Sequence, residues 1–256
     1  MKPNLISVII TYYKKRRYIE KTINSLRQQT YNNYQLVFVY DDPNKEDLVF
    51  LRKILSKIKN KKILINKNNL GVAKSRNKAK KFIKGKFTAF LDADDIWKKN
   101  KLSEEIKILK KNKNAEIIYS NYICNNQKKS VKFLKFTTKL PSGFITQNLL
   151  NDYKIGILTC LVKKKLFEKF KFNADYEIIG DFDFFIRASV YNKILSIQKP
   201  LAVYRVHENN FSLKNNYIYF SELSKWIKKM SKNKIFKNYN FFYIKKYLFK
   251  IKIKYI

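Results

Sequence analysis

Three carboxylates fall within four consecutive positions of the chain, at Asp92-Ala93-Asp94-Asp95. They directly follow residues 87–91, a short apolar run of the kind that forms a buried strand. Carboxylates this close repel one another unless a cation lies among them, so the cluster predicts a divalent metal site. Mg²⁺ and Mn²⁺ suit such oxygen ligands and commonly complete their shells with water and substrate phosphate. The alternative is a loop whose carboxylates cap the helix that begins near Ile96.

A second pair of carboxylates, Asp181 and Asp183, lies where a helix is expected over residues 181–191. Side chains two residues apart on a helix point in different directions, so the pair does not share one ligand. A carboxylate beside a substrate hydroxyl can accept its proton as a general base, whereas one at a helix start can simply cap the helix. His207 is the only histidine of the chain, and a lone histidine is more often structural than a ligand.

The elements that must position these residues alternate between strands and helices. Apolar runs predict strands at residues 5–11, 35–40, 62–65 and 87–91. Helices are predicted at residues 18–29, 46–59, 72–84 and 99–112, the third of them stopped by Gly85. This alternation predicts an α/β fold with a mostly parallel, Rossmann-like sheet flanked by helices. Ligands bind such sheets outside the carboxyl ends of the strands, where Thr11, Asp41-Asp42 and the cluster at 92–95 occur.

The second half of the chain is less regular. Strands are predicted at 116–124 and 201–204, helices at 163–170 and 181–191, and mostly loop over 125–156. Residues 211–256 form a basic, aromatic tail, which is either an amphipathic element at a membrane surface or a helical extension packed on the domain. Its aromatic residues, interleaved with lysine, include Trp226, Phe241, Phe242, Tyr243, Tyr247 and Phe249.

The formal net charge of the 256-residue chain is +37. Binding to nucleic acid or to an anionic membrane would explain this charge, and so would compositional drift in an AT-rich coding sequence. Drift is the favoured explanation, because 49 lysines accompany only 7 arginines and a nucleic-acid binder would use more arginine for bidentate contacts. Without a membrane-spanning apolar run or a signal peptide, the expected location is the cytoplasm. Cys124 and Cys160 are expected to be small core residues.

Several ordered sequence blocks resemble those of the family 2 glycosyltransferases, which share the GT-A fold. The resemblance is colinear over residues 5–210, and blocks at familiar spacing carry more weight together than any one alone. The blocks are Ser7 through Tyr13, Tyr18 through Tyr31, Val39-Tyr40-Asp41-Asp42, Asn69 through Asn77, Gly85-Lys86-Phe87 and Phe90 through Trp97. In two places the chain departs from the pattern, because Pro43-Asn44 replaces the usual Gly-Ser and Lys14 replaces the usual Asn.

The resemblance implies a nucleotide-sugar site in the first half of the chain. Thr11, Tyr13 and Asp42 would line the base pocket, since a carboxylate can accept a hydrogen bond from a ring N–H of uracil and a tyrosine ring can stack. Arg76 would approach the diphosphate or the ribose, or else lie on the surface of its helix. Asp92 would face the ribose.

The resemblance also implies the metal ligands and the catalytic base. Asp94 or Asp95 would hold Mn²⁺ or Mg²⁺, with Asp94 also counted among the residues that bind the donor. His207 lies in Tyr204-Arg205-Val206-His207, which is similar to a late family segment that approaches the diphosphate or the metal. Asp181 matches the family's catalytic base.

These implications together predict an inverting, metal-dependent glycosyltransferase. It would move a sugar from a nucleotide-diphosphate donor, preferably a UDP-sugar, to a hydroxyl of a saccharide or lipid-linked acceptor in cell-surface polysaccharide or glycolipid synthesis. Residues 1–115 would bind the donor, residues 116–210 would supply the acceptor site and base, and residues 211–256 would form an extension that contacts the inner face of the membrane. The alternative is a protein that binds anionic surfaces or nucleic acid on a degenerate transferase scaffold; nucleic acid is not the expected partner.

Overall fold

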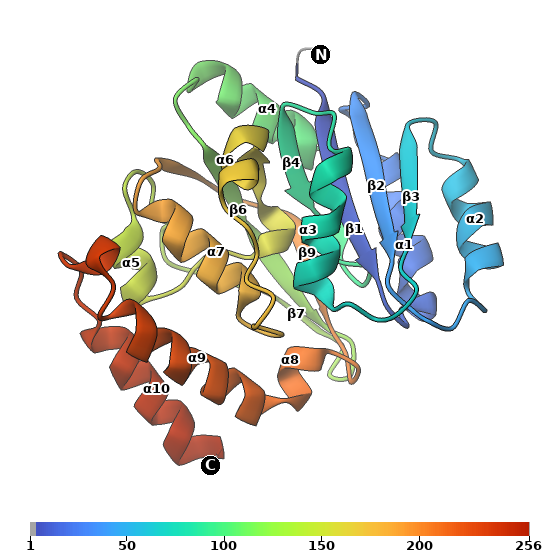
Figure 1. Cartoon of the computed structure of the whole chain (residues 1–256). Coiled ribbons are helices and arrows are strands. Elements are labelled where there is room, and N and C mark those ends of the chain that lie inside the picture. The colour runs from blue at the N-terminus through green and yellow to red at the C-terminus, as the bar shows by residue number, and fades with distance from the viewer. Residues whose placement is uncertain (1–3, 256) are drawn as a thin grey trace.

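A computed structural model describes residues 4–255, which fold around one central sheet (Figure 1). Within these residues the sheet has nine strands in the order β3-β2-β1-β4-β8-β6-β9-β5, and β7 pairs with β6 beside this path. The strands are β1 (Ile6–Tyr12), β2 (Tyr34–Tyr40), β3 (Lys61–Ile65), β4 (Phe87–Phe90), β5 (Ile96–Trp97), β6 (Ile117–Asn126), β7 (Val131–Leu134), β8 (Leu161–Lys163) and β9 (Ile194–Val206). The predicted mostly parallel α/β sheet is confirmed for β3, β2, β1 and β4, which all run in parallel.

Helices cover both faces of this sheet. They are α1 (Arg16–Arg27), α2 (Leu48–Ser56), α3 (Val72–Ala79), α4 (Lys101–Lys111), α5 (Thr146–Asn151), α6 (Lys164–Lys169), α7 (Gly180–Ser189), α8 (Phe211–Lys214), α9 (Asn216–Met230) and α10 (Phe242–Tyr255). Buried side chains alternate along β1: Val8 and Ile10 pack with α1, α2 and α4, whereas Ile9 packs with α3 and α7. This alternation is the period of two that a strand imposes, and it explains why both faces of β1 are apolar.

The end of α3 differs from the sequence-based expectation. The helix ends at Ala79, a short 3-10 turn follows over Lys80–Phe82, and Gly85 does not stop the helix. Gly85 instead lies against β1, where a Cβ atom would stand 2.5 Å from the carbonyl oxygen of Leu5. Glycine is therefore required here because two backbone segments approach closely, not because a helix ends.

Residues 125–156 are mostly loop, as predicted, but three short elements in this segment were not foreseen. The segment contains the end of β6, the strand β7 and the helix α5. Every side chain of β7 is exposed, and the strand has only four residues, so it is too short and too exposed to give the pattern of a half-buried strand.

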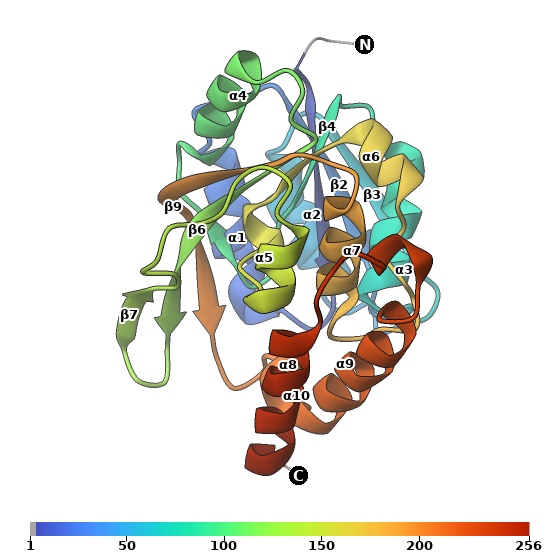
Figure 2. The same ribbon diagram turned by 90° about the vertical axis from the view of Figure 1, so that its left-hand side faces the viewer.

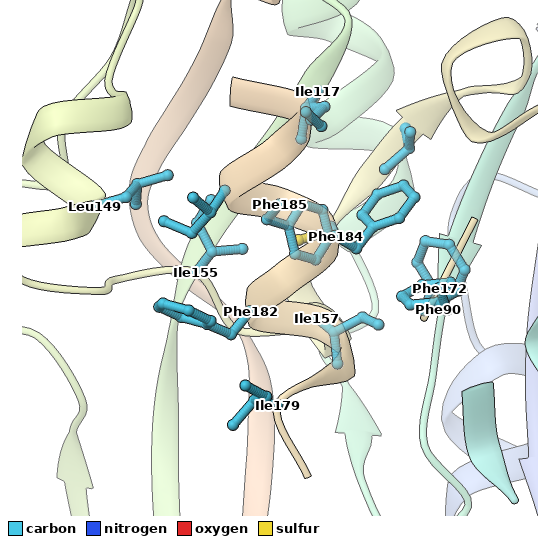
Figure 3. Close-up of a cluster of buried hydrophobic side chains, with 14 of the residues drawn as sticks. Phe90, Ile117, Leu149, Ile155, Ile157, Phe172, Ile179, Phe182, Phe184 and Phe185 are labelled. Atoms are coloured by element: carbon cyan, nitrogen blue, oxygen red, sulfur yellow. The ribbon is translucent and has the colours of Figure 1, made fainter. Parts of the chain in front are cut away.

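The C-terminal tail packs onto the second half of the sheet. Helices α9 and α10 lie next to each other beside α5 and α7 (Figure 2). Trp226 of α9 is fully buried, its ring contacts that of Phe182, and its Nε1 donates a hydrogen bond of 3.0 Å to Oδ1 of Asp183. The same hydrophobic cluster contains Phe182, Phe184 and Phe185 of α7, which Figure 3 shows directed into the core. The inner face of the tail is therefore packed on the domain, as the helical-extension alternative predicted.

No helix between residues 4 and 255 combines the length and the apolar character needed to cross a bilayer. Cys124 and Cys160 are both buried and free, as expected for core residues.

Candidate functional site

The ends of β1 and β2 bring the predicted base-pocket residues together. The parallel register places Thr11 beside Val39, so Tyr13 and Asp42 follow the two strands at the same edge of the sheet. The ring of Tyr13 is 42% exposed, whereas Asp42 is buried. Oδ1 of Asp42 accepts a hydrogen bond of 3.1 Å from the backbone N–H of Asn44, which closes a tight turn over Pro43. The departure from the usual Gly-Ser is therefore accommodated by Asp42 itself.

Asp41 holds a neighbouring loop in place, a structural role that the sequence alone did not distinguish from the role of Asp42. Its Oδ1 accepts hydrogen bonds from Asn66 Nδ2 at 2.6 Å and from the backbone N–H of Leu70 at 2.9 Å. These bonds fix the loop that leads from β3 into α3. Both aspartates are buried, but Asp41 is committed to the loop before α3, whereas Asp42 holds only the turn over Pro43.

Arg76 of α3 lies behind β4 and pairs with the first aspartate of the acidic cluster. Its Nη2 is 2.6 Å from Oδ1 of Asp92, and its guanidinium lies over the ring of Phe172 at 5.3 Å. Arg76 is buried and so is not a surface residue of its helix, while one third of the Asp92 side chain is exposed. The pair thus presents one carboxylate edge to solvent, at the place where the donor's ribose was expected.

Asp94 is held by two groups from distant segments. Its Oδ2 lies 2.8 Å from Nζ of Lys15 and 3.1 Å from Nε2 of His207. Although burial by itself raises the pKa of Asp94, the hydrogen bond from His207 and the charge of Lys15 lower it to about 2. Asp94 is therefore an anion at neutral pH.

The ring of His207 is fixed on both sides. It stacks on Tyr18 at 4.2 Å between centroids, and its Nδ1 accepts a hydrogen bond of 3.1 Å from the backbone N–H of Asn209. A neutral imidazole that accepts at Nδ1 carries its proton on Nε2, which then donates to Asp94. For Nε2 to bind a metal, this proton must move to Nδ1 and the bond from Asn209 must break.

Asp95 is directed into the protein and away from Asp94 Oδ2. It is 1% exposed, and its Oδ1 accepts a hydrogen bond of 3.0 Å from the backbone N–H of Arg205 on β9. Burial raises the pKa of Asp95, and the nearby charges of Asp94 and Asp92 raise it further. Asp95 thus ties β9 to the end of β4, and the structure does not bring it together with His207 around one point.

A metal at this cluster would need ligands from outside the protein. Among the residues that the structure describes, no three His, Cys, Asp or Glu side chains are grouped as they are in a protein-built metal site. Mg²⁺ is commonly held by one or two carboxylates together with substrate phosphates and water. Asp94 fits this pattern, because it is ionised and already attracts the ammonium group of Lys15.

Asp181 lies at the start of α7 and lines a cavity of about 380 Å³. Burial raises the pKa of Asp181, and the positive charge of Arg76 opposes this rise. The cavity wall also includes Tyr153, whose buried hydroxyl has no hydrogen-bond partner among the described residues. The other lining residues include Phe182, Leu223, Ile244, Tyr219 and Tyr247. The cavity is therefore a largely apolar and aromatic pocket whose wall also contains the carboxylates of Asp181 and Asp152 and the unsatisfied hydroxyl of Tyr153.

Residues from the tail fix the position of Asp181. The carboxylate of Glu222 on α9 accepts hydrogen bonds from the backbone N–H groups of Glu177 at 2.6 Å, Ile178 at 3.0 Å and Ile179 at 3.1 Å. Asp183 is turned away into a bond with Trp226 and an ion pair with Arg187. Of Asp181 and Asp183, only Asp181 lines the cavity, and the two side chains point apart as their spacing predicted.

The sequence interpretation missed three residues of this site: Lys15, Glu222 and Tyr153. Lys15 is hidden among 49 lysines, and nothing local distinguishes it. Glu222 lies 41 positions after Asp181, so its contact with the start of α7 depends on the packing of the tail. A sequence signal was available only for Glu222, which is a rare acid in a strongly basic tail.

Comparison with known proteins gives the same assignment at the level of family and fold. Residues 7–172 match the family described as Glycosyl transferase family 2. Over 170 residues the chain is 36% identical to the Escherichia coli protein WfgD, named as a UDP-Glc:alpha-D-GlcNAc-diphosphoundecaprenol beta-1,3-glucosyltransferase. That match covers 66% of this chain and 64% of WfgD, so the chain spans less than two thirds of that relative's length.

Two solved structures share the fold. The mannosyltransferase PcManGT from Pyrobaculum calidifontis, in complex with GDP-Man and Mn²⁺, matches with a TM-score of 0.67 at 15% identity, over 97% of this chain and 70% of that one. S. aureus TarS 1-349 in complex with UDP-GlcNAc matches with a TM-score of 0.66 at 16% identity, over 87% of this chain and 66% of that one. At these identities the likeness establishes the fold, and it confirms the predicted GT-A architecture.

Proposed function

The chain belongs to glycosyl transferase family 2, and we propose that it transfers a sugar from a nucleotide-diphosphate donor to an acceptor hydroxyl with inversion at the anomeric carbon. The observation that carries this proposal is the position of Asp181. Asp181 lines an aromatic cavity, and the charges of Arg76 and Asp92, at the carboxyl end of β4, act on its pKa. The proposed base is therefore close to the proposed donor-binding edge.

The donor would lie across the carboxyl ends of β1, β2 and β4. Thr11, Tyr13 and Asp42 would bind the base, with the exposed ring of Tyr13 available for stacking. Asp92, oriented by Arg76, would accept a hydrogen bond from the ribose. The solved relatives hold UDP-GlcNAc and GDP-Man, and we favour a uracil nucleotide here because a carboxylate at Asp42 can accept a hydrogen bond from a uracil ring N–H.

Asp94 would hold a divalent cation, Mn²⁺ or Mg²⁺, together with oxygens of the donor diphosphate and water. When bound, such an ion stabilises the negative charge that develops on the leaving diphosphate. Lys15 would give up its contact with Asp94 to make room, and His207 would join after the proton shift described above. We leave Asp95 out of this proposed ligand set, because it is buried and bonded to the backbone of Arg205.

Asp181 would accept the proton of the acceptor hydroxyl as its oxygen attacks the anomeric carbon and the bond to the diphosphate breaks. A carboxyl whose pKa is raised is a better base than an ordinary aspartate, because its proton affinity is closer to neutral pH. The unsatisfied hydroxyl of Tyr153 in the same cavity would gain a partner from the acceptor.

The acceptor would be lipid-linked and would belong to cell-surface polysaccharide or glycolipid synthesis. WfgD is named for an acceptor carried on diphosphoundecaprenol, and the cavity beside Asp181 is walled by α9 and α10 of the tail. The tail would then bring the cavity to the membrane surface.

The outer face of α10 supports this membrane contact. Its inner face buries Ile244 and Ile251, yet Phe242, Phe249 and Ile253 are exposed. Positions separated by seven and eleven residues fall within an arc of about 40° on a helix, so these three side chains form one apolar stripe opposite the buried face. Lysines border the stripe at Lys245, Lys246, Lys250 and Lys252. An apolar stripe bordered by lysine is the pattern of a helix that lies in the surface of an anionic bilayer.

Donor binding can be tested by the melting temperature in the presence of UDP-glucose and Mn²⁺. A ligand that binds the folded chain raises the melting temperature, so we expect an increase that requires both components. Asp94→Asn should remove the Mn²⁺-dependent part, whereas the exposed control Asp175→Asn should retain it. An unchanged response in Asp94→Asn would contradict the metal assignment. No response to any nucleotide sugar, with salt-sensitive RNA binding instead, would favour the alternative of a degenerate scaffold.

A further inference from the structure

A second hollow, here called the α1–β7 pocket, is lined in part by Tyr18, the residue whose ring stacks on His207. It has a volume of about 470 Å³, and eight residues line it: Arg17, Tyr18, Lys21, Asn125, Gln127, Ser130, Lys132 and Arg205. Four of these eight are cationic and none is acidic. The α1–β7 pocket shares the Tyr18 ring and Arg205 with the donor site, but it contains none of the residues assigned to the donor or to the base.

The floor of the α1–β7 pocket is a buried guanidinium. Arg205 is 1% exposed, its Nε donates to the carbonyl oxygen of Asp94, and its Nη2 donates to the carbonyl oxygen of Tyr18 at 3.0 Å and to Oγ1 of Thr22 at 2.7 Å. Its Nη1 is also buried, but it has no hydrogen-bond partner among the residues that the structure describes. A buried charged donor without a partner is unfavourable, and since Arg205 lines the pocket, a ligand bound there is a source of the missing acceptor.

The rim supplies further positive charge and neutral donors. Arg17, Lys21 and Lys132 are exposed around the opening, and Asn125 and Gln127 at the end of β6 add side-chain amides. A guanidinium in the floor with amines at the rim is the donor set that phosphate oxygens prefer. The volume is in the range of small-molecule sites and exceeds what a single phosphate fills, so the phosphate would be carried on a larger group.

We propose that the α1–β7 pocket binds a phosphate or diphosphate group, with Arg205 Nη1 donating from the floor and Arg17, Lys21 and Lys132 from the rim. This group could belong to a free phosphorylated molecule or to the head group of a lipid, and both present the same oxygens. The pocket is independent of the sugar-transfer proposal, because none of its rim residues belongs to the donor or base machinery.

The test uses the full chain in EDTA, so that no divalent ion bridges a phosphate to Asp94. The double variant Lys21→Ala/Lys132→Ala removes two rim charges, and Lys107→Ala/Lys110→Ala on the exposed face of α4 removes the same charge elsewhere. Binding of inorganic pyrophosphate is measured by calorimetry, and binding to phosphatidylcholine vesicles that contain phosphatidylglycerol is measured by cosedimentation. All four substituted lysines are at the surface or pocket rim, so both variants should fold.

We expect the rim variant to lose at least about tenfold in affinity relative to the matched control, because two charged contacts are removed. A loss for pyrophosphate supports a free phosphorylated ligand. A loss for vesicles alone supports a lipid head group. Equal affinities of the rim variant and the control for both probes would overturn the proposal, because the binding would then reflect net charge only.

Discussion

The proposed donor side and the proposed acceptor side of this molecule hold their carboxylates by different means. On the donor side, Asp42, Asp92 and Asp94 follow directly from buried parallel strands, and the strand register alone brings them to one edge. On the acceptor side, Asp181 begins a helix whose start is fixed by Glu222 from the tail. The difference shows that the strands are sufficient to bring Asp42, Asp92 and Asp94 to one edge, where Lys15 and His207 then hold Asp94, whereas the position of Asp181 itself depends on packing with the tail.

The largest effect should come from removing the packing between the tail and α7. We expect Trp226→Ala to lower the free energy of unfolding by about 3–5 kcal/mol, because it opens a cavity in the core and removes the indole donor to Asp183, which then keeps only its ion pair with Arg187. Urea unfolding measures this change. Phe242→Ala, on the exposed face of α10, is the control and should stay within about 0.5 kcal/mol of the parent. Similar losses in the two variants would refute the view that the inner face of the tail is part of the core.

A smaller effect is expected from the cap that the tail places on α7. Glu222→Gln keeps the shape but removes the charge that accepts three backbone N–H groups, which should cost about 1–2 kcal/mol of stability. If the cap positions Asp181, kcat for transfer should fall while the KM for the donor stays constant. A rise in donor KM with unchanged kcat would show that the two sides are not separated as described.

The effect of the Arg76 charge on the pKa of Asp181 can be tested by measuring activity as a function of pH. Burial raises the pKa of Asp181 and Arg76 opposes this rise, so the carboxylate is protonated and inactive below its pKa in the folded enzyme. Activity should therefore fall as the pH decreases through that pKa. Arg76→Gln removes the opposing charge, so the acid limb of log(kcat/KM) should move to higher pH, and donor affinity should fall by about tenfold. An acid limb that stays in place would mean that Asp181 is not the titrating base.

The smallest change in stability is expected on the outer face of α10. Phe242→Ser/Phe249→Ser removes two exposed rings and should leave the free energy of unfolding within about 0.5 kcal/mol. Cosedimentation with anionic vesicles should nevertheless drop at least about tenfold, since both rings would lose their contact with the bilayer. The pair Tyr191→Ser/Val49→Ser, exposed far from α10 in sequence, is the matched control. Equal vesicle binding in both doubles would contradict the membrane contact.

The sequence predicts the strands on the proposed donor side better than the elements around Asp181. The strands β1, β2 and β4 were predicted within one residue at each end because they are continuous apolar runs, and the residues after them could be named in advance. By contrast, β7 is a four-residue strand without a buried side chain, and α5 lies in a segment predicted as loop. Asp94 and Asp95 are adjacent and chemically identical, so only tertiary contacts distinguish them: Lys15 and His207 hold Asp94, and the backbone N–H of Arg205 holds Asp95. Glu222 and Lys15 acquire their partners through tertiary packing, which no local pattern encodes.

Single-turnover transfer by Asp181→Asn, compared with donor binding by the same variant, tests the central claim most directly. Asparagine keeps the shape of the side chain but cannot accept the acceptor proton, so we predict a rate loss of about 10²–10⁴-fold with an unchanged dissociation constant for the nucleotide sugar. Asp175→Asn should transfer at the parental rate. Full activity of Asp181→Asn on its acceptor would contradict the account.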